Sequence, residues 1–214
     1  MGKSVLNLCM LSGSFEYDSE TSLNIFKSFV EKNYPIQANL IVYDSEDDDP
    51  SLAVLDDTDV LLVFTRRLNT AGESLRQFQT YCEQGRPLVG VRTASHAYQN
   101  WLEFDKTVLG GDYQGHYGHG PTVQLETVAT EHPILNGIPR FESYGSLYKN
   151  PSLRDDTSVL LMGHTDEHSE PVAWTRLRNG GRICYTSLGH QKDFELEPFL
   201  QFLAQSILWV SKQI

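Results

Sequence analysis

A short apolar segment of the chain, residues 87–96 (PLVGVRTASH), ends in side chains that can carry acid–base and anion-binding chemistry. An apolar run bounded by glycine and proline on one side and by polar residues on the other is typical of a fully buried parallel strand. Ligands of open α/β sheets bind outside the carboxyl ends of such strands. The sequence therefore predicts that Arg92, Ser95 and His96 face a binding site.

Further imidazoles lie in two other parts of the chain. His190 follows another apolar run, and His116 and His119 lie in a glycine-rich stretch where a tight turn could bring both onto one ion. Two interpretations stay open. The histidines bind water or sugar hydroxyls in a polar loop, or the fold assembles a site for a divalent metal such as Zn, with His96, His116 and His190 as candidate ligands. Any other cofactor is unknown.

Three more residue types suit a small polar ligand. Arg66 and Arg67 follow an expected strand, and clustered guanidinium groups bind anions or polyhydroxyl ligands through planar forks of hydrogen bonds. The alternative for one of them is a surface salt bridge. Glu16, in the turn after the first strand, is a candidate general base, with His96 as the next candidate. Tyr148 is an aromatic that can stack on a sugar ring.

These side chains need a scaffold, and the hydrophobic pattern predicts one. Strands are expected at residues 5–10, 39–43, 60–64 and 87–92, with helices following residue 18 and spanning residues 70–83. This alternation implies an α/β fold with a mostly parallel central sheet and helices on both faces. The second half adds partly antiparallel strands at residues 121–128, 158–162, 172–175 and 182–186, a long loop at 101–120 and a helix opened by Pro198. We expect a single domain over residues 1–214.

Composition excludes several classes of partner. The net charge of −11 disfavours a nucleic-acid groove or an anionic membrane surface. Three widely spaced cysteines without a Cys-x-x-Cys pair indicate reduced thiols. No apolar run is long enough to span a bilayer. We therefore expect a cytoplasmic protein without nucleic-acid or membrane partners. A removed signal peptide and a homo-oligomer both stay open.

The segment at residues 87–96 resembles the nucleophile turn of class I glutamine amidotransferases. In that family a catalytic Cys lies within a Gly-x-Cys-x-Gly run, whereas Arg92 stands at its place here. His190 has the strand-end position of the family's catalytic His, but the residue two after it is Lys192 rather than Glu. The sequence predicts this architecture without glutaminase chemistry.

Four segments in order and spacing resemble the ThuA-like family, named for trehalose utilisation. They are residues 110–116 (GGDYQGH), 132–137 (HPILNG), 171–175 (PVAWT) and 181–190 (GRICYTSLGH). The resemblance implies a class I glutamine amidotransferase-like, flavodoxin-like fold and a link to trehalose and related disaccharides through their oxidised keto forms. Residues 145–148 (GSLY) depart from the Asp-Glu-Leu-Tyr run of many members, which indicates a divergent branch.

Two function hypotheses follow. The first is an enzyme, a hydrolase or lyase, that acts on a sugar or oxidised (keto) sugar derivative, and the histidine- and arginine-rich strand ends favour it. The second is a non-catalytic binding protein for a small polar or carbohydrate ligand, and the missing triad favours it. The candidate catalytic residues are Glu16, His96 and His190, and the candidate substrate-binding residues are Arg66, Arg92, His116, His119 and Tyr148.

Overall fold

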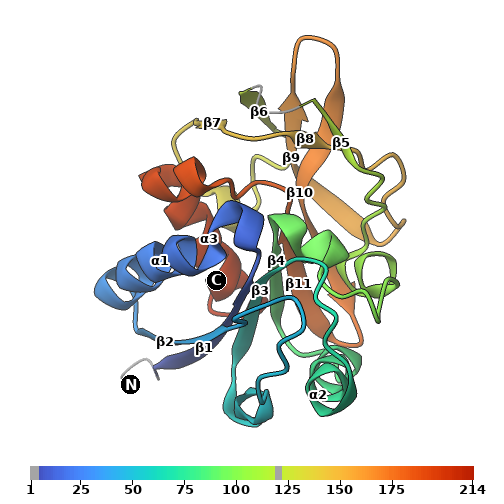
Figure 1. Ribbon diagram of the computed structural model, residues 1–214. Coiled ribbons are helices and arrows are strands. Elements are labelled where there is room, and N and C mark those ends of the chain that lie inside the picture. Colours follow the sequence, from blue (N-terminus) through green and yellow to red (C-terminus); the bar gives the residue numbers. More distant parts are fainter. Residues whose placement is uncertain (1–4, 119–121) are drawn as a thin grey trace.

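Apolar runs that alternate with amphipathic helices build the first half of the chain into a parallel sheet. The computed structural model describes residues 5–118 and 122–214 (Figure 1). The first elements are β1 (Leu6–Gly13), α1 (Ser19–Asn33), β2 (Ile36–Val42), β3 (Val60–Thr65), α2 (Gly72–Glu83) and β4 (Leu88–Val91). The strands pair in parallel in the order β2-β1-β3-β4, and this parallel pairing is what the sequence predicts.

The second half of the chain extends the same sheet and then reverses its direction. The strand β11 (Gly181–Thr186) pairs in parallel with β4. Antiparallel pairing then continues through β10 (Ser169–Arg178), β9 (Thr157–His164), β6 (Val123–Thr127) and β7 (Glu142–Ser143). Within the described residues the sheet has nine strands, in the order β2-β1-β3-β4-β11-β10-β9-β6-β7. A small separate ribbon joins β5 (His116–Tyr117) to β8 (Leu147–Tyr148).

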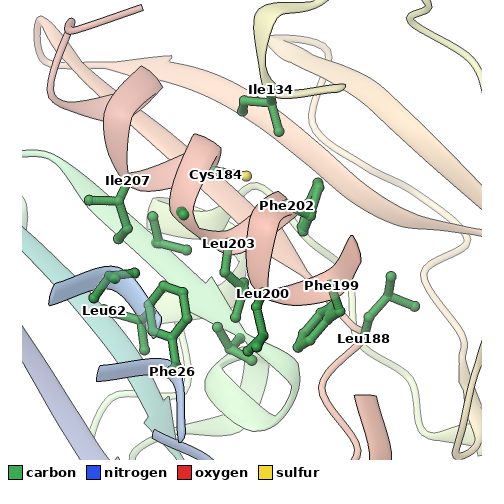
Figure 2. Packing of buried hydrophobic residues seen from close by; sticks show 14 of the residues in the cluster. Phe26, Leu62, Ile134, Cys184, Leu188, Phe199, Leu200, Phe202, Leu203 and Ile207 are labelled. Atoms are coloured by element: carbon green, nitrogen blue, oxygen red, sulfur yellow. The ribbon is translucent and has the colours of Figure 1, made fainter. Parts of the chain in front are cut away.

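Helices cover both faces of the sheet, as the sequence predicts. One apolar cluster packs α1 and α3 (Glu197–Val210) on one face, and a second packs α2 on the other. Figure 2 shows Phe199, Leu203 and Ile207 of α3 beside Phe26 of α1 and Leu62 of β3. Burying each such side chain contributes about 1.5–3 kcal/mol. This packing holds the sheet in place, so the loops at its edge are attached to a well-packed core.

The segment at residues 101–120 differs from the single loop that the sequence predicts. A π-helix, η4 (Asp105–Leu109), lies within it, and β5 follows. A single π-turn has no hydrophobic period of its own, so the sequence pattern does not reveal it. Short 3₁₀ turns elsewhere are η1 (Phe15–Tyr17), η2 (Ala53–Asp57), η3 (Arg92–His96), η5 (Pro133–Leu135) and η6 (Gln191–Glu195). None of the helices described combines the length and hydropathy needed to cross a bilayer.

Candidate functional site

The strands β1, β3, β4 and β11 run in one direction, so their carboxyl ends share one edge of the sheet. The chain goes from β1 to β2 on one side and returns to β3 on the other side of β1, so the strand order reverses between β1 and β3. Ligands of α/β sheets bind at such reversal points. Glu16 follows β1 and Arg66 follows β3. An ion pair of 3.1 Å between Glu16 Oε2 and Arg66 Nε crosses this point, so the structure brings these two candidates together.

Arg92 begins the turn after β4 with a positive φ of 47° and folds its side chain inward. The residue is 1% exposed. Its Nη1 donates to the Ser187 carbonyl at 2.7 Å. The guanidinium carbon lies 4.6 Å from the ring centroid of Tyr17 and 4.7 Å from that of Tyr148. Arg92 therefore joins two aromatic rings and the β11 end, and its guanidinium is covered rather than open to the outside.

His96, at the end of the same turn, has a strongly perturbed imidazole. Its Nδ1 lies 3.0 Å from the Ser95 hydroxyl, and its ring stacks on Tyr113 with centroids 4.4 Å apart and planes 16° apart. Burial, followed by the positive charges of Arg66 and Arg67, lowers the pKa of His96 to about 3. The imidazole is therefore neutral near pH 7, the state in which one ring nitrogen accepts a proton or a hydrogen bond.

Pairing of the ribbon brings His116 toward the same group of rings. His116 of β5 lies opposite Tyr148 of β8, with ring centroids 6.5 Å apart. Tyr148 is buried, and its ring centroid lies 6.1 Å from that of His96 and 4.7 Å from that of Tyr113. The structure thus gathers His96 and His116 around one aromatic cluster. The candidate His119 lies outside the described residues.

His190 lies at the other end of a chain of contacts. Its ring meets Tyr17 edge-on at 6.0 Å between centroids, and its Nδ1 accepts the Lys192 amide at 3.2 Å. From Tyr17 the contacts continue to Arg92, then to Tyr148 and finally to His96. His190 therefore caps the turn η6, and it approaches the other two histidines only through this column of side chains.

Asp193 organises the turn that follows β11. Its carboxylate accepts the backbone amides of Gly189, His190 and Tyr144 at 2.8–3.0 Å, and the Ser143 hydroxyl at 2.7 Å. Burial raises the pKa of Asp193, and these hydrogen bonds oppose the rise. The carboxylate serves the backbone, so it does not orient the His190 imidazole as a triad carboxylate would.

Metal ligation was one of the interpretations left open by the sequence. Across residues 5–118 and 122–214, the structure holds no group of three or more His, Cys, Asp or Glu side chains placed to bind a metal ion. The described donors of His96, His116 and His190 do not make up a ligand set.

Two residues of this region were not singled out by the sequence. Tyr17 supplies one of the rings against Arg92, and Asp105 opens the π-helix beside His96 and Tyr113. A cavity of about 300 Å³ lies next to these two rings, and Asp105 lines it. In the sequence, the only signal for Asp105 is an acidic residue shortly before the pair Gly110 and Gly111. Because we expected an exposed loop there, the sequence gave no reason to predict that Asp105 is buried.

A family model identifies the family of this chain, and solved structures share its fold. The family model described as trehalose utilisation matches residues 10–210. A putative ThuA-like protein from Parabacteroides merdae superposes with a TM-score of 0.79 at 17% identity, covering 97% of this chain and 90% of that one. A second, from Bacteroides uniformis, gives 0.75 at 19% identity, covering 98% and 93%. The fold also matches 31% of the β-galactosidase chain from Bacillus circulans sp. alkalophilus, with a TM-score of 0.61, 12% identity and 96% of this chain covered. At these identities the structures share the fold. No curated protein sequence matches the chain.

Proposed function

We propose a sugar-directed activity from the premise that this chain belongs to the trehalose utilisation (ThuA) family. The proposed ligand is a small sugar or an oxidised (keto) sugar derivative. It would bind at the edge of the sheet where β1, β3 and β4 end. The observation that carries the proposal is the neutral imidazole of His96, stacked on Tyr113 and close to the Glu16–Arg66 pair.

Each group of this site suits a part of such a ligand. The half-buried Tyr113 ring offers an apolar face to the C–H side of a sugar ring. The guanidinium of Arg66 presents a fork of donors to hydroxyl or ketone oxygens. If the ligand carries a ketone, Glu16, the first candidate base, can take the proton from the neighbouring carbon, while neutral His96 accepts a hydrogen bond from a ligand hydroxyl. The C–H electron pair then forms the C=C bond of an enolate, and the π pair of the C=O bond moves onto the ketone oxygen, where a guanidinium stabilises the negative charge.

Glutamine hydrolysis is not part of the proposal. Arg92 stands at the nucleophile position and has no group that forms an acyl intermediate. Its side chain is buried against Tyr17 and Tyr148. The second candidate function, a non-catalytic binding protein, rests on the burial of Arg92. A turn held in place by Tyr17 and Tyr148 can form one side of a binding site, but Arg92 itself offers no nucleophile.

The cellular setting is also proposed. Cys9, Cys82 and Cys184 are all free and buried, and burial raises the pKa of each thiol. Buried reduced thiols support a reducing compartment such as the cytoplasm. The neighbouring β-galactosidase, a sugar-active enzyme by its description, carries this fold as one part of a longer chain, which fits a carbohydrate role.

The test is a screen of trehalose, sucrose and their 3-keto forms, each with and without added divalent metal. Binding is measured by calorimetry and conversion by sugar chromatography, for the native chain, for His96→Asn and for the control His164→Gln, whose side chain pairs with Glu126 on the far strands. Conversion that falls at least 100-fold in His96→Asn alone supports the enzyme. Binding without conversion supports the binding protein. Absence of both binding and conversion for all sugars contradicts both hypotheses.

A further inference from the structure

A cavity beside the proposed site has a lining that the sequence did not anticipate. It has a volume of about 300 Å³ and lies between the turn η3 and the π-helix η4. Ligand pockets usually range upward from about 300 Å³, so this one suits a molecule of a single ring. Its polar lining consists of Ser95, His96, Glu103, Asp105, Lys106, Asp112 and Tyr113. It therefore shares His96 and Tyr113 with the site described above.

Asp105 is the buried acid of this cavity, and it is only partly satisfied. The residue is 6% exposed. Its Oδ2 accepts the Tyr113 amide at 2.8 Å, while its Oδ1 is buried without a hydrogen-bond partner. A buried polar atom without a partner costs about 1–3 kcal/mol, so proteins retain few of them. Asp105 is also the first residue of a π-helix, and short π-helical turns are frequent at functional sites.

The chain around Asp105 is fitted to its carboxyl group. A methyl group at Gly111 would lie 2.3 Å from Asp105 Oδ1, which only glycine avoids. The backbone oxygen of Asp105 accepts the amide of Gly110 at 2.7 Å, so the segment folds tightly around this residue. If Asp105 only held the loop in place, Oδ2 and the backbone oxygen would be sufficient for that role. A purely structural role therefore does not explain why Oδ1 is buried without a hydrogen-bond partner.

Electrostatics set the protonation of this carboxyl group. Burial raises the pKa of Asp105 to about 7; the Tyr113 amide opposes that rise and the Asp112 charge adds to it. The ionisable groups that face it are Glu103 and Lys106 of its own segment, Asp112 of the following loop, His96 of η3 and the Tyr185 phenol of β11. Both protonation states are therefore populated near neutral pH, which is the condition for an efficient acid or base.

We propose that Asp105 gives a proton to the ketone oxygen of a single-ring, oxidised polyhydroxyl ligand held in this cavity. The proposal rests on the proposed function and deepens it by adding the acid to the site. The protonated carboxyl group gives its O–H proton to the ligand oxygen, whose lone pair forms the new O–H bond. The O–H bonding pair stays on Asp105 as a carboxylate, and the proton that the base took from the neighbouring carbon returns to Asp105 through water before the next ligand binds.

The first experiment follows carboxyl titration by ¹³C NMR in the native chain between pH 4 and 9, with no ligand needed. We expect the Asp105 carboxyl resonance to titrate near neutral pH. It should be missing in Asp105→Asn and still present in the control Asp112→Asn. The native Asp112 carboxylate lines the same cavity but accepts a hydrogen bond from Gln114 Nε2. A purely structural carboxylate that titrates below pH 5 overturns the proposal.

The second experiment repeats the sugar screen with both variants. Asparagine keeps an oxygen for the Tyr113 amide, so we expect Asp105→Asn to bind within about threefold of the native chain. Conversion should fall at least 100-fold and lose its pH dependence around neutrality. If the native chain binds without conversion, its affinity should change through pH 7, and the affinity of the variant should not.

The outcomes separate the two proposals. Native-like conversion or affinity at every pH in Asp105→Asn contradicts the role of Asp105 and leaves the proposed function standing. A native chain that neither binds nor converts any of the sugars contradicts the proposed function, and the proton exchange of Asp105 falls with it.

Discussion

Gly145 and Arg92 are in such close contact that a methyl group at position 145 would lie 2.8 Å from Arg92 Nη2. Gly145 also has a positive φ of 95°, a conformation that other residues rarely adopt. Two independent constraints therefore require glycine beside the guanidinium. These constraints explain in physical terms why position 145 of this chain holds glycine rather than a residue with a side chain.

Gly145→Ala should destabilise the fold by about 2–4 kcal/mol, because backbone strain and the contact with Arg92 add. Gly137→Ala is the matched control: Gly137 also has a positive φ, 72°, but open space around its Cα. It should lose about 1–2 kcal/mol. Urea unfolding of both variants gives the comparison, and equal losses would contradict the close contact.

Arg92→Lys should destabilise the fold by about 2–4 kcal/mol. A lysine cannot reproduce the planar group that lies against Tyr17 and Tyr148 while donating to Ser187. The control is Arg76→Lys, at an exposed arginine of α2 paired with Glu73, which should leave the stability close to that of the native chain. A loss at Arg92 as small as at Arg76 would show that the buried contacts contribute little. Chemical denaturation measures both.

Arg92→Cys should not hydrolyse glutamine, although it restores the residue type of the amidotransferase nucleophile. Asp193 is committed to backbone amides, and His190 Nδ1 accepts the Lys192 amide. Within the described part of the chain, no carboxylate is hydrogen-bonded to the His190 imidazole to orient it as a base. Glutamate release measured with a working class I amidotransferase as positive control tests this. Hydrolysis that scales with the variant's concentration would show that the base is available after all.

Stability should fall as the pH drops below about 6.5, and His96 should account for part of the fall. Its pKa is about 3 in the folded chain against 6.5 in the unfolded chain, so only the unfolded chain gains this proton between these values. The slope from this residue is at most about 1.4 kcal/mol per pH unit.

The measurement for His96 is urea unfolding of the native chain and of His96→Asn at pH 7, 5.5 and 4.5. The variant does not titrate at this position, so the difference in stability between the two proteins should shrink in the acid range. Parallel stability curves across the three pH values would contradict a buried neutral imidazole.

The local pattern of apolar residues was sufficient to predict which residues follow the strand ends. It was not sufficient to predict the direction in which their side chains point. Buried apolar runs put Arg66 and Arg92 at strand ends, because strand burial is visible in the residues themselves. Whether Arg92 points outward depends on Tyr17 and Tyr148, which are distant in sequence and meet it only in the fold. The π-helix at residues 105–109 was missed for another reason, because a single π-turn has no hydrophobic period that a sequence pattern could reveal.

The bond from Arg92 Nη1 to the Ser187 carbonyl joins residues 95 positions apart and follows a strand, β11, that enters the sheet between β4 and β10. During synthesis, the first hundred residues leave the ribosome with β4 as an unpaired edge and a buried cation without its acceptor. Non-local pairing of this kind is slow, because the entropy cost of closing the long loop is incurred before the new contacts stabilise the chain. The turn at Arg92 can therefore reach its final shape only after nearly the whole chain has been made, so we expect the β4 edge to be completed late in folding.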